Sequence, residues 1–155
     1  MDTYNQPSEI FPDQGPAVYG GFWERFAAAF LDGLIIGIPV AIIQYMLGEF
    51  GNTEYSGDLF RAYFSLGNLI SIVASWLYAA LMESSPGQAT IGKKALGLKV
   101  TTTDGGRISF GQATGRHFGK WLSAILLLIG YLMMLWDDRK QTLHDKMAGT
   151  LVVKR

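Results

Sequence analysis

Cysteine is absent from this sequence of 155 residues, and histidine occurs only twice. The lack of cysteine excludes disulfides, thiolate catalysis and thiolate-ligated metal sites. Two histidines and scattered acids cannot assemble an adequate metal cluster, and no activated serine accompanies them. We therefore expect no metal, no cofactor and no catalytic activity. The sequence also lacks a recognisable nucleic-acid-binding motif, so neither DNA nor RNA is an expected partner.

Charge is scarce along three apolar runs. Residues 26–47 contain a single charged side chain, Asp32, and residues 62–82 contain none. Each of these two runs reaches about 30 Å as a helix, which is enough to cross a bilayer. Residues 121–136 form a shorter run that suits a short crossing, a broken helix or a re-entrant hairpin. The sequence thus predicts a mainly α-helical membrane protein with two transmembrane helices and a third short hydrophobic helix, either re-entrant or membrane-crossing.

The zero net charge conceals two halves of opposite sign. Residues 1–65 carry eight acids and two bases, whereas residues 66–155 carry five acids and eleven bases. The bases gather between the second and third runs and after the third, and the positive-inside rule favours the cytoplasm for both groups. We therefore expect two crossings of a bacterial inner membrane, a cytoplasmic N-terminus, an outward loop over residues 48–61, and a third element that does not fully cross.

Three further segments differ from the apolar runs. Residues 1–18 are polar and contain three prolines, with neither a basic start nor a cleavage site, so we expect a disordered tail without a signal peptide. The membrane domain then covers residues 19–155. Residues 99–110 surround an Asp-Gly-Gly turn and predict a β-hairpin, and residues 150–154 predict a third strand. Together they would form a small three-stranded element on the cytoplasmic face.

Asp32 is the most informative single residue, because an acid at membrane depth costs about 2.5–3.5 kcal/mol and marks a functional-site candidate. Arg25 lies seven residues earlier, so both side chains project from one helical face about 10 Å apart. This spacing predicts a shared polar stripe in which the two do not pair directly.

Two local patterns resemble catalytic or nucleotide-binding motifs. Residues 87–93 match the start of a phosphate-binding loop, but Lys94 stands where a magnesium-binding Ser or Thr is required. The alternative is a glycine-rich turn that enters a short basic helix. His144 precedes Asp145, and this pair could pass protons near neutral pH or make a helix-end hydrogen bond.

Three sequence blocks, in this order, resemble the RDD family of integral membrane proteins. They are Tyr19–Phe26 followed by Asp32, Gly87–Lys94 followed by Gly97–Val100, and Leu143–Lys146 followed by Ala148–Thr150. The family is named for an arginine at the start of the first helix and two aspartates. Arg25 and Asp32 match the first two positions. For the second aspartate, the resemblance favours Asp145, with Asp137 in reserve.

The resemblance associates the chain with exchange of Na⁺, Li⁺ or K⁺ for protons. Two or three helices cannot surround an ion path alone, so transport would require a homo-oligomer, and small residues such as Gly33 and Gly37 favour helix association. The residues expected to couple ions and protons are Arg25, Asp32, Asp137, His144 and Asp145.

The alternative function is a membrane scaffold or accessory subunit. The same Arg and Asp residues would then form a structural ion network, and removing one member would destabilise the protein. A basic cytoplasmic face would contact anionic lipid or another protein. The residues expected on this face are Lys93, Lys94, Lys99, Arg107, Arg116 and Lys120.

Overall fold

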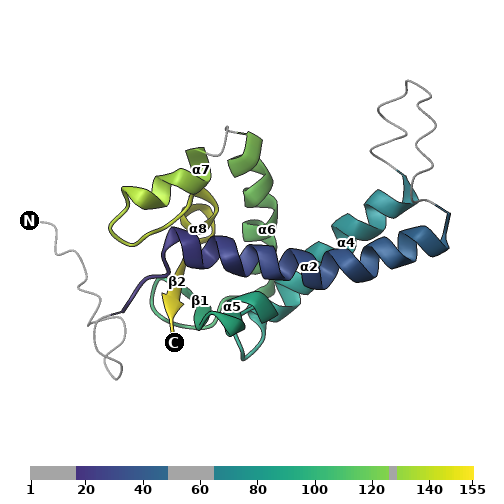
Figure 1. Ribbon diagram of the computed structural model, residues 1–155. Helices are drawn as coiled ribbons and strands as arrows, with labels where there is room; N and C mark the ends of the chain where they lie inside the picture. The colour runs from purple at the N-terminus through teal and green to yellow at the C-terminus, as the bar shows by residue number, and fades with distance from the viewer. Residues whose placement is uncertain (1–16, 49–64, 126–128) are drawn as a thin grey trace, which may run out of the picture.

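The computed structural model describes residues 17–48, 65–125 and 129–155. Most of the predicted tail and of the predicted outward loop lies outside these ranges. The described elements are, in chain order, α2 (Phe22–Met46), α4 (Leu66–Ser84), α5 (Ile91–Ala95), β1 (Leu98–Thr102), α6 (Phe110–Ile125), α7 (Ile129–Leu132), the 3-10 helix η1 (Met133–Leu135), α8 (Leu143–Ala148) and β2 (Thr150–Lys154). In Figure 1, α2 and α4 project together from a cap that is formed by α5, α8, β1 and β2.

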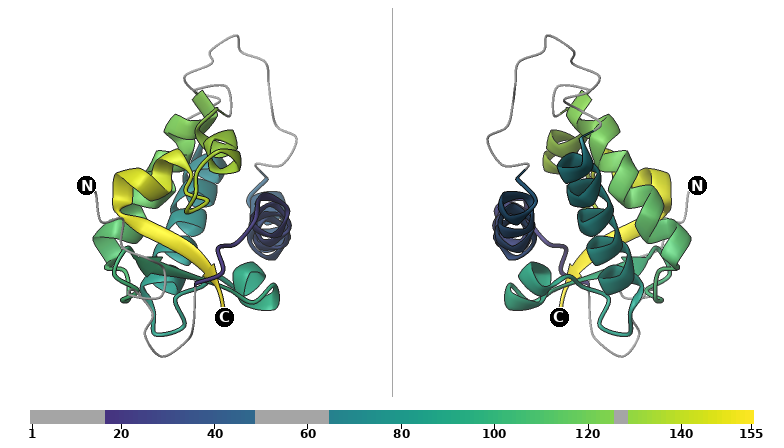
Figure 2. Two further views of the ribbon diagram at one scale, coloured as in Figure 1. Left: turned by 90° about the vertical axis from the view of Figure 1, so that its left-hand side faces the viewer. Right: turned by 90° about the vertical axis from the view of Figure 1, so that its right-hand side faces the viewer.

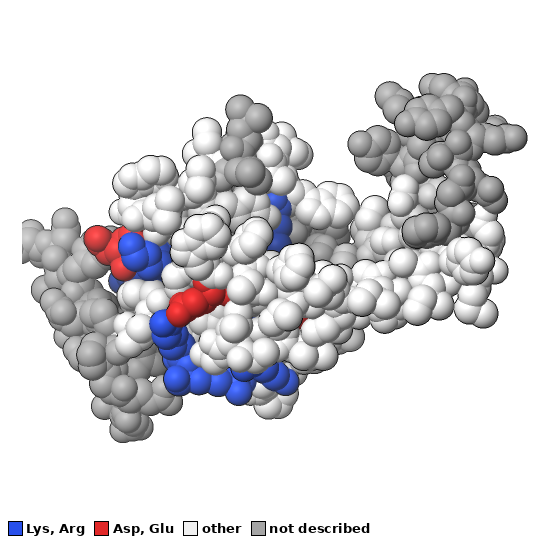
Figure 3. Space-filling view, in the orientation of Figure 1, with Lys and Arg blue, Asp and Glu red and all other residues white. Residues whose placement is uncertain are grey.

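The two predicted crossings are confirmed, because α2 and α4 are both long and apolar enough to span a membrane. They run antiparallel: the Gln44 side-chain amide donates to the Gly67 carbonyl at 2.8 Å, near the end of α2 and the start of α4. The Ser65 hydroxyl caps α4 by accepting the Asn68 N–H at 3.3 Å. The described parts of both helices that project beyond the cap are free of Lys, Arg, Asp and Glu (Figure 3).

The third hydrophobic element is also confirmed, with a different start. Helix α6 begins at Phe110, well before the predicted run at residue 121, and the segment formed by α7 and η1 is bent by 116° relative to it. Such a bend is what a broken span or a re-entrant loop requires. Beyond its packed face, α6 exposes apolar side chains that include Trp121 and Ile125.

The predicted β-hairpin is wrong in one of its two strands. β1 pairs antiparallel with the C-terminal strand β2, with Val100 opposite Val152. The expected turn does form, since the Thr102 N–H donates to the Gly106 carbonyl at 2.9 Å. However, Ser109 and Gln112 exchange reciprocal hydrogen bonds between side chain and backbone, which is a capping box that starts α6 where the second strand was expected.

The sheet is therefore two-stranded, and the remaining edge contact comes from the chain preceding α2. Tyr19 forms an isolated antiparallel bridge with Val153, and the Gly20 N–H donates to the Val152 carbonyl at 2.9 Å. Views along the long axis of α2 show β2 crossing the end of the helices from α8 toward α5 (Figure 2). The segment before α2 and the C-terminal strand β2 therefore lie side by side in the cap.

A single apolar cluster joins the cap to the helices. It contains buried side chains from both spans, from both strands and from α6, and it includes Ala28, Ala80, Val100, Ala113 and Val152. Helix α5 packs against α2, and it follows the glycine-rich turn that was the alternative to a phosphate-binding loop. The core thus holds the cap against the ends of α2 and α4, where the charged residues converge.

Candidate functional site

Five charged side chains from five different helices meet beneath the cap. We call them the ion network: Arg25 of α2, Glu83 of α4, Lys93 of α5, Arg116 of α6 and Asp145 of α8. Glu83, Arg116 and Asp145 are each no more than 1% exposed. Charges this deeply buried require partners, because their desolvation is costly.

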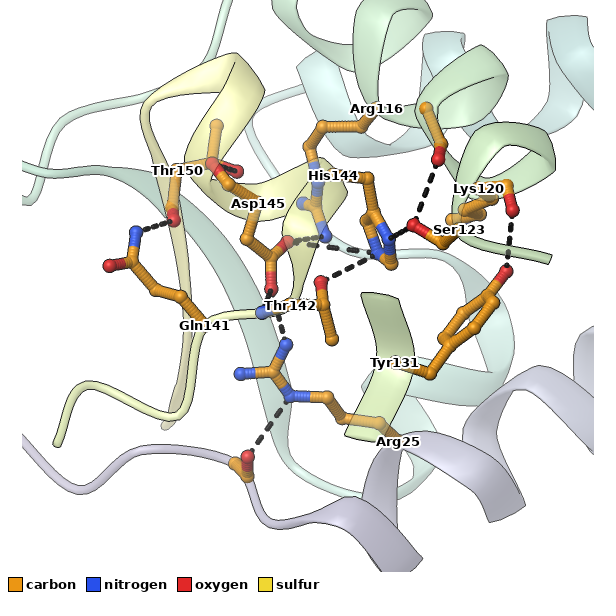
Figure 4. Close-up of polar contacts among 12 residues, drawn as sticks. Arg25, Arg116, Lys120, Ser123, Tyr131, Gln141, Thr142, His144, Asp145 and Thr150 are labelled. Atoms are coloured by element: carbon orange, nitrogen blue, oxygen red, sulfur yellow. Dashed lines mark hydrogen bonds and ion pairs between the residues drawn. The ribbon is translucent and has the colours of Figure 1, made fainter. Parts of the chain in front are cut away.

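Asp145 is the centre of the ion network (Figure 4). One carboxylate oxygen lies 2.5 Å from Arg25 Nη1 and the other lies 2.7 Å from Arg116 Nη2. The Thr142 N–H also donates to this carboxylate, at 3.2 Å. Burial opposes ionisation of Asp145, but Arg116 and then Arg25 outweigh it and hold the pKa well below its usual range. Asp145 is therefore a carboxylate shared by two arginines.

Arg25 uses all three of its guanidinium nitrogens. Besides the contact with Asp145, Nε donates to the Gly20 carbonyl at 3.0 Å and Nη2 donates to the Lys140 carbonyl at 2.6 Å. A planar guanidinium suits this task, since its donors point in fixed directions. One side chain on α2 thereby holds α8, the segment before α8 and the segment before α2.

Glu83 is the second acid of the ion network, and its position at the end of an apolar run did not single it out in the sequence. It is buried and pairs with Lys93 and with Arg116, whose Nη1 lies 3.3 Å from its carboxylate. Lys93 and Arg116 are therefore paired inside the fold, and the prediction that they lie on an exposed basic face is wrong. Burial also lowers the pKa of Lys93 to about 8, although Glu83 favours its charged form.

The sequence contains a signal that could have identified Arg116. Ala113, Gly119 and Ser123 recur at helical spacing on the same side of α6 as Arg116, and all four are buried. Small residues on one face allow close helix packing, so an arginine among them is directed toward a neighbouring helix.

The rest of the predicted basic face is divided. Lys94 and Arg107 are exposed, Lys99 is partly buried, and Lys120 is partly buried beside the ion network. The surface that could meet lipid headgroups or a protein is therefore smaller than predicted.

Asp32 belongs to a separate cluster that connects α2 with α4 and α5. Its carboxylate accepts hydrogen bonds from the Tyr78 hydroxyl at 2.7 Å, the Thr90 hydroxyl at 2.5 Å and the Gly92 N–H at 2.8 Å. The sequence analysis did not predict that these three groups donate to Asp32. Asp32 and Arg25 thus do not share one polar stripe, because each has its own partners and lines a different cavity.

His144 and Asp137 lie at the edge of the ion network. His144 Nε2 is 3.0 Å from the Thr142 hydroxyl but 3.9 Å from Asp145, which is too far for a hydrogen bond. Burial lowers the pKa of His144 to about 3, so its imidazole is neutral at physiological pH. Asp137 pairs with Lys146 at 2.5 Å and accepts the Gln141 N–H at 2.9 Å. These contacts hold the segment between η1 and α8 in place.

Two cavities adjoin these clusters. The first, of about 520 Å³, lies between α2 and α4 and is lined by Asp32, Tyr78 and Glu83 among others. The second, of about 460 Å³, lies between the start of α2 and the α6–α7 segment, and Arg25 and Arg116 line it. Within residues 17–48, 65–125 and 129–155, no group of three or more His, Asp or Glu side chains could hold a metal ion.

Comparisons with known proteins place these features in a family. The RDD family matches residues 19–149. The chain is 39% identical to the uncharacterised protein YxaI of Bacillus subtilis over 145 residues, covering 86% of this chain and 95% of that protein. It is 31% identical to the uncharacterised membrane protein YteJ of the same organism, covering 87% and 80%. No solved structure matches the chain.

A further relative is longer than this chain. The proline-rich antigen homolog of Mycobacterium tuberculosis is 34% identical over 116 residues, which cover 73% of this chain and 47% of that protein. The matched unit therefore makes up nearly all of one relative and about half of another.

Proposed function

Because this chain belongs to the RDD family of membrane proteins, we propose that it is a non-catalytic membrane scaffold or accessory module. The observation that carries the proposal is the ion network, in which Arg25 and Arg116 both contact the carboxylate of Asp145. Every acid of the network is already neutralised by bases of the same chain. Such an arrangement fixes the cap on the spans, and leaves no acid of the network free to exchange a cation for a proton.

The family match supports a module, because the same unit occurs at nearly full length in YxaI and as about half of a mycobacterial protein. In this role the cap presents a defined surface at one face of the membrane. We place that face in the cytoplasm of a bacterial cell, because the basic residues gather there. A second copy of the chain is a candidate partner, since added Cβ atoms at Gly33 and Gly37 would meet nothing within 4 Å.

Exchange of a monovalent cation for a proton is the second candidate, and Asp32 is the observation that favours it. This acid of a span lines the cavity of about 520 Å³ between α2 and α4. Its hydrogen-bond donors are neutral hydroxyl and amide groups, so among the described residues no base compensates its charge directly. A Na⁺, Li⁺ or K⁺ ion would have to replace some of these donors, and a homo-oligomer would have to complete its path.

Transport measurements on reconstituted protein separate the two candidates. Proteoliposomes that contain the parent or the Asp32→Asn variant receive Na⁺, Li⁺ or K⁺ outside, while a trapped dye reports the internal pH. The scaffold proposal predicts no cation-driven proton movement in either sample. Proton movement in the parent that is lost in a folded Asp32→Asn variant would overturn it and establish exchange.

A further inference from the structure

The cavity of about 460 Å³ at the start of α2 has an unusual lining, and we call it the basic cavity. Its charged lining residues are all bases, and no acid lines it. The basic lining residues are Arg25, Lys93, Arg116 and Lys120. They come from α2, α5 and α6, so the fold brings them together from separate parts of the chain.

The four bases that line the basic cavity outnumber the acids that pair with them. Glu83 and Asp145 pair with Arg25, Lys93 and Arg116. In the described ranges, the Lys120 ammonium makes no hydrogen bond and no ion pair. Two acids against four bases leave an excess of two positive charges beside the cavity.

Arg116 gives a second, independent indication of an anion-binding site. It is 1% exposed, yet its Nε and Nη1 atoms have no hydrogen-bond partner among the described residues. Nη1 lies 3.3 Å from Glu83 without hydrogen-bond geometry. Because buried donors are almost always satisfied, these N–H groups indicate an acceptor that is not part of the chain.

Most of the remaining wall of the basic cavity is apolar. It includes Phe22 and Phe26 of α2 and Leu132 and Met134 of the α7–η1 segment. Phe26 is 57% exposed on a helix that spans the membrane, so this wall continues onto the surface that meets lipid chains. A ligand that fits both parts has an anionic head and a long apolar tail.

We propose that the basic cavity binds one anionic phospholipid. The phosphate lies against Lys120 and the unsatisfied N–H groups of Arg116, and an acyl chain follows Phe22 and Phe26 along α2. The site lies inside the fold, unlike a basic surface that only attracts headgroups. The inference goes beyond the scaffold proposal and does not depend on whether the protein transports ions.

Native mass spectrometry of the detergent-purified full-length chain tests this site, with phosphatidylglycerol or phosphatidylcholine added in increasing amounts. Lys120→Gln removes the charge that no acid of the described residues pairs with, so the ion network stays intact. Lys94→Gln is the matched control, because Lys94 is an exposed lysine that lines neither described cavity. We expect the parent to retain phosphatidylglycerol preferentially, and Lys120→Gln to weaken that retention by about fivefold, with Lys94→Gln unchanged.

Three outcomes would overturn the proposal. The first is equal retention of the two lipids by the parent. The second is an equal loss in Lys120→Gln and Lys94→Gln, which would indicate a general surface charge effect. The third is inorganic phosphate displacing phosphatidylglycerol at millimolar concentration in a Lys120-dependent way, which would indicate a site for a free anion. Lys120→Arg, which keeps the charge, is expected to retain phosphatidylglycerol as the parent does.

Discussion

The surroundings of the Asp145 side chain support a structural role for the ion network. Its carboxylate is fully buried between two guanidinium groups, so removing its charge leaves Arg116 without that partner in a buried site. We expect Asp145→Asn to destabilise the folded protein by about 3–5 kcal/mol, the range for breaking one partner of a buried ion pair. Chemical unfolding of the purified protein in mild detergent, followed by tryptophan fluorescence, measures the loss.

Asp138→Asn is the matched control for that change. Asp138 is an exposed aspartate seven residues earlier in the chain, and we expect its amide variant to unfold within about 0.5 kcal/mol of the parent. Similar unfolding of both variants would contradict a structural role for Asp145.

His144 gives the protein a dependence of stability on pH. Its folded-state pKa is about 3 and its ordinary value is 6.5, so between these values the unfolded chain binds a proton that the folded chain does not. We therefore expect the contribution of His144 to stability to be fully present above pH 6.5 and to fall as the pH decreases toward 3, by up to about 1.4 kcal/mol per pH unit.

The His144→Gln variant checks this assignment. We expect its unfolding free energy to change less than that of the parent between pH 6.5 and pH 4.5. Parallel curves for the two proteins over that range would show that another group causes the acid sensitivity.

Sequence reasoning identified part of this site. It chose Arg25 and Asp32 because charges in or beside an apolar run require an explanation, and it chose Asp145 from the family resemblance. It missed Glu83, because an acid at the end of an apolar run equally suits the membrane interface. The pairing of α4 with α6, which buries Glu83 against Arg116, is a tertiary contact that helical spacing within one element does not contain.

At the scale of elements, the packing of α5 on α2 depends on one glycine. A Cβ atom at Gly92 would lie 2.3 Å from the Ala28 carbonyl oxygen, and 2.9 Å from the carboxylate of Asp32. Because backbone cannot yield as a flexible side chain does, we expect Gly92→Ala to separate the helices, break the Gly92–Asp32 hydrogen bond and lower stability by at least about 2 kcal/mol. Thermal unfolding followed by circular dichroism measures the change.

Gly115→Ala is the comparison, because Gly115 is an exposed residue of α6 where a Cβ would meet nothing within 4 Å. Alanine is favoured over glycine inside a helix by about 1 kcal/mol, so this variant should be as stable as the parent or more so. Equal loss in both variants would contradict the close packing of α5 on α2.

The two long helices were predictable from the sequence, whereas the strand pairing was predictable only in part. Long apolar runs predicted α2 and α4, since length and hydropathy alone determine whether a helix can span a bilayer. The strand pairing was not predictable in full. The turn at residues 104–106 is local and forms, but β1 pairs with β2 from the other end of the domain. The short capping signal of Ser109 and Gln112 outweighed the strand preference of the residues around it.

For the whole molecule, the fold places the basic segments before α6 and after η1 at the same end. Two crossings with a bent third element would leave both segments on one side of the membrane, whereas a third crossing would separate them. The absence of cysteine makes a direct test possible, because single introduced cysteines can be labelled without background.

We expect Lys94→Cys and Asp138→Cys to react only when a membrane-impermeant maleimide reaches the cytoplasmic side. Ser56→Cys, in the segment between the spans, should react from the opposite side. Labelling of Lys94→Cys and Asp138→Cys from opposite sides would show that the third element crosses completely.

We expect Arg25 to hold the cap on the first span. Arg25→Gln removes its ion pair with Asp145 and its fork-shaped contacts to the Gly20 and Lys140 carbonyls. Hydrogen–deuterium exchange measured by mass spectrometry compares the parent and this variant in the same detergent. We predict at least about tenfold faster exchange in residues 143–154, with α4 unchanged, because the cap opens while the span remains folded. Unchanged exchange in α8 and β2 would contradict this role of Arg25.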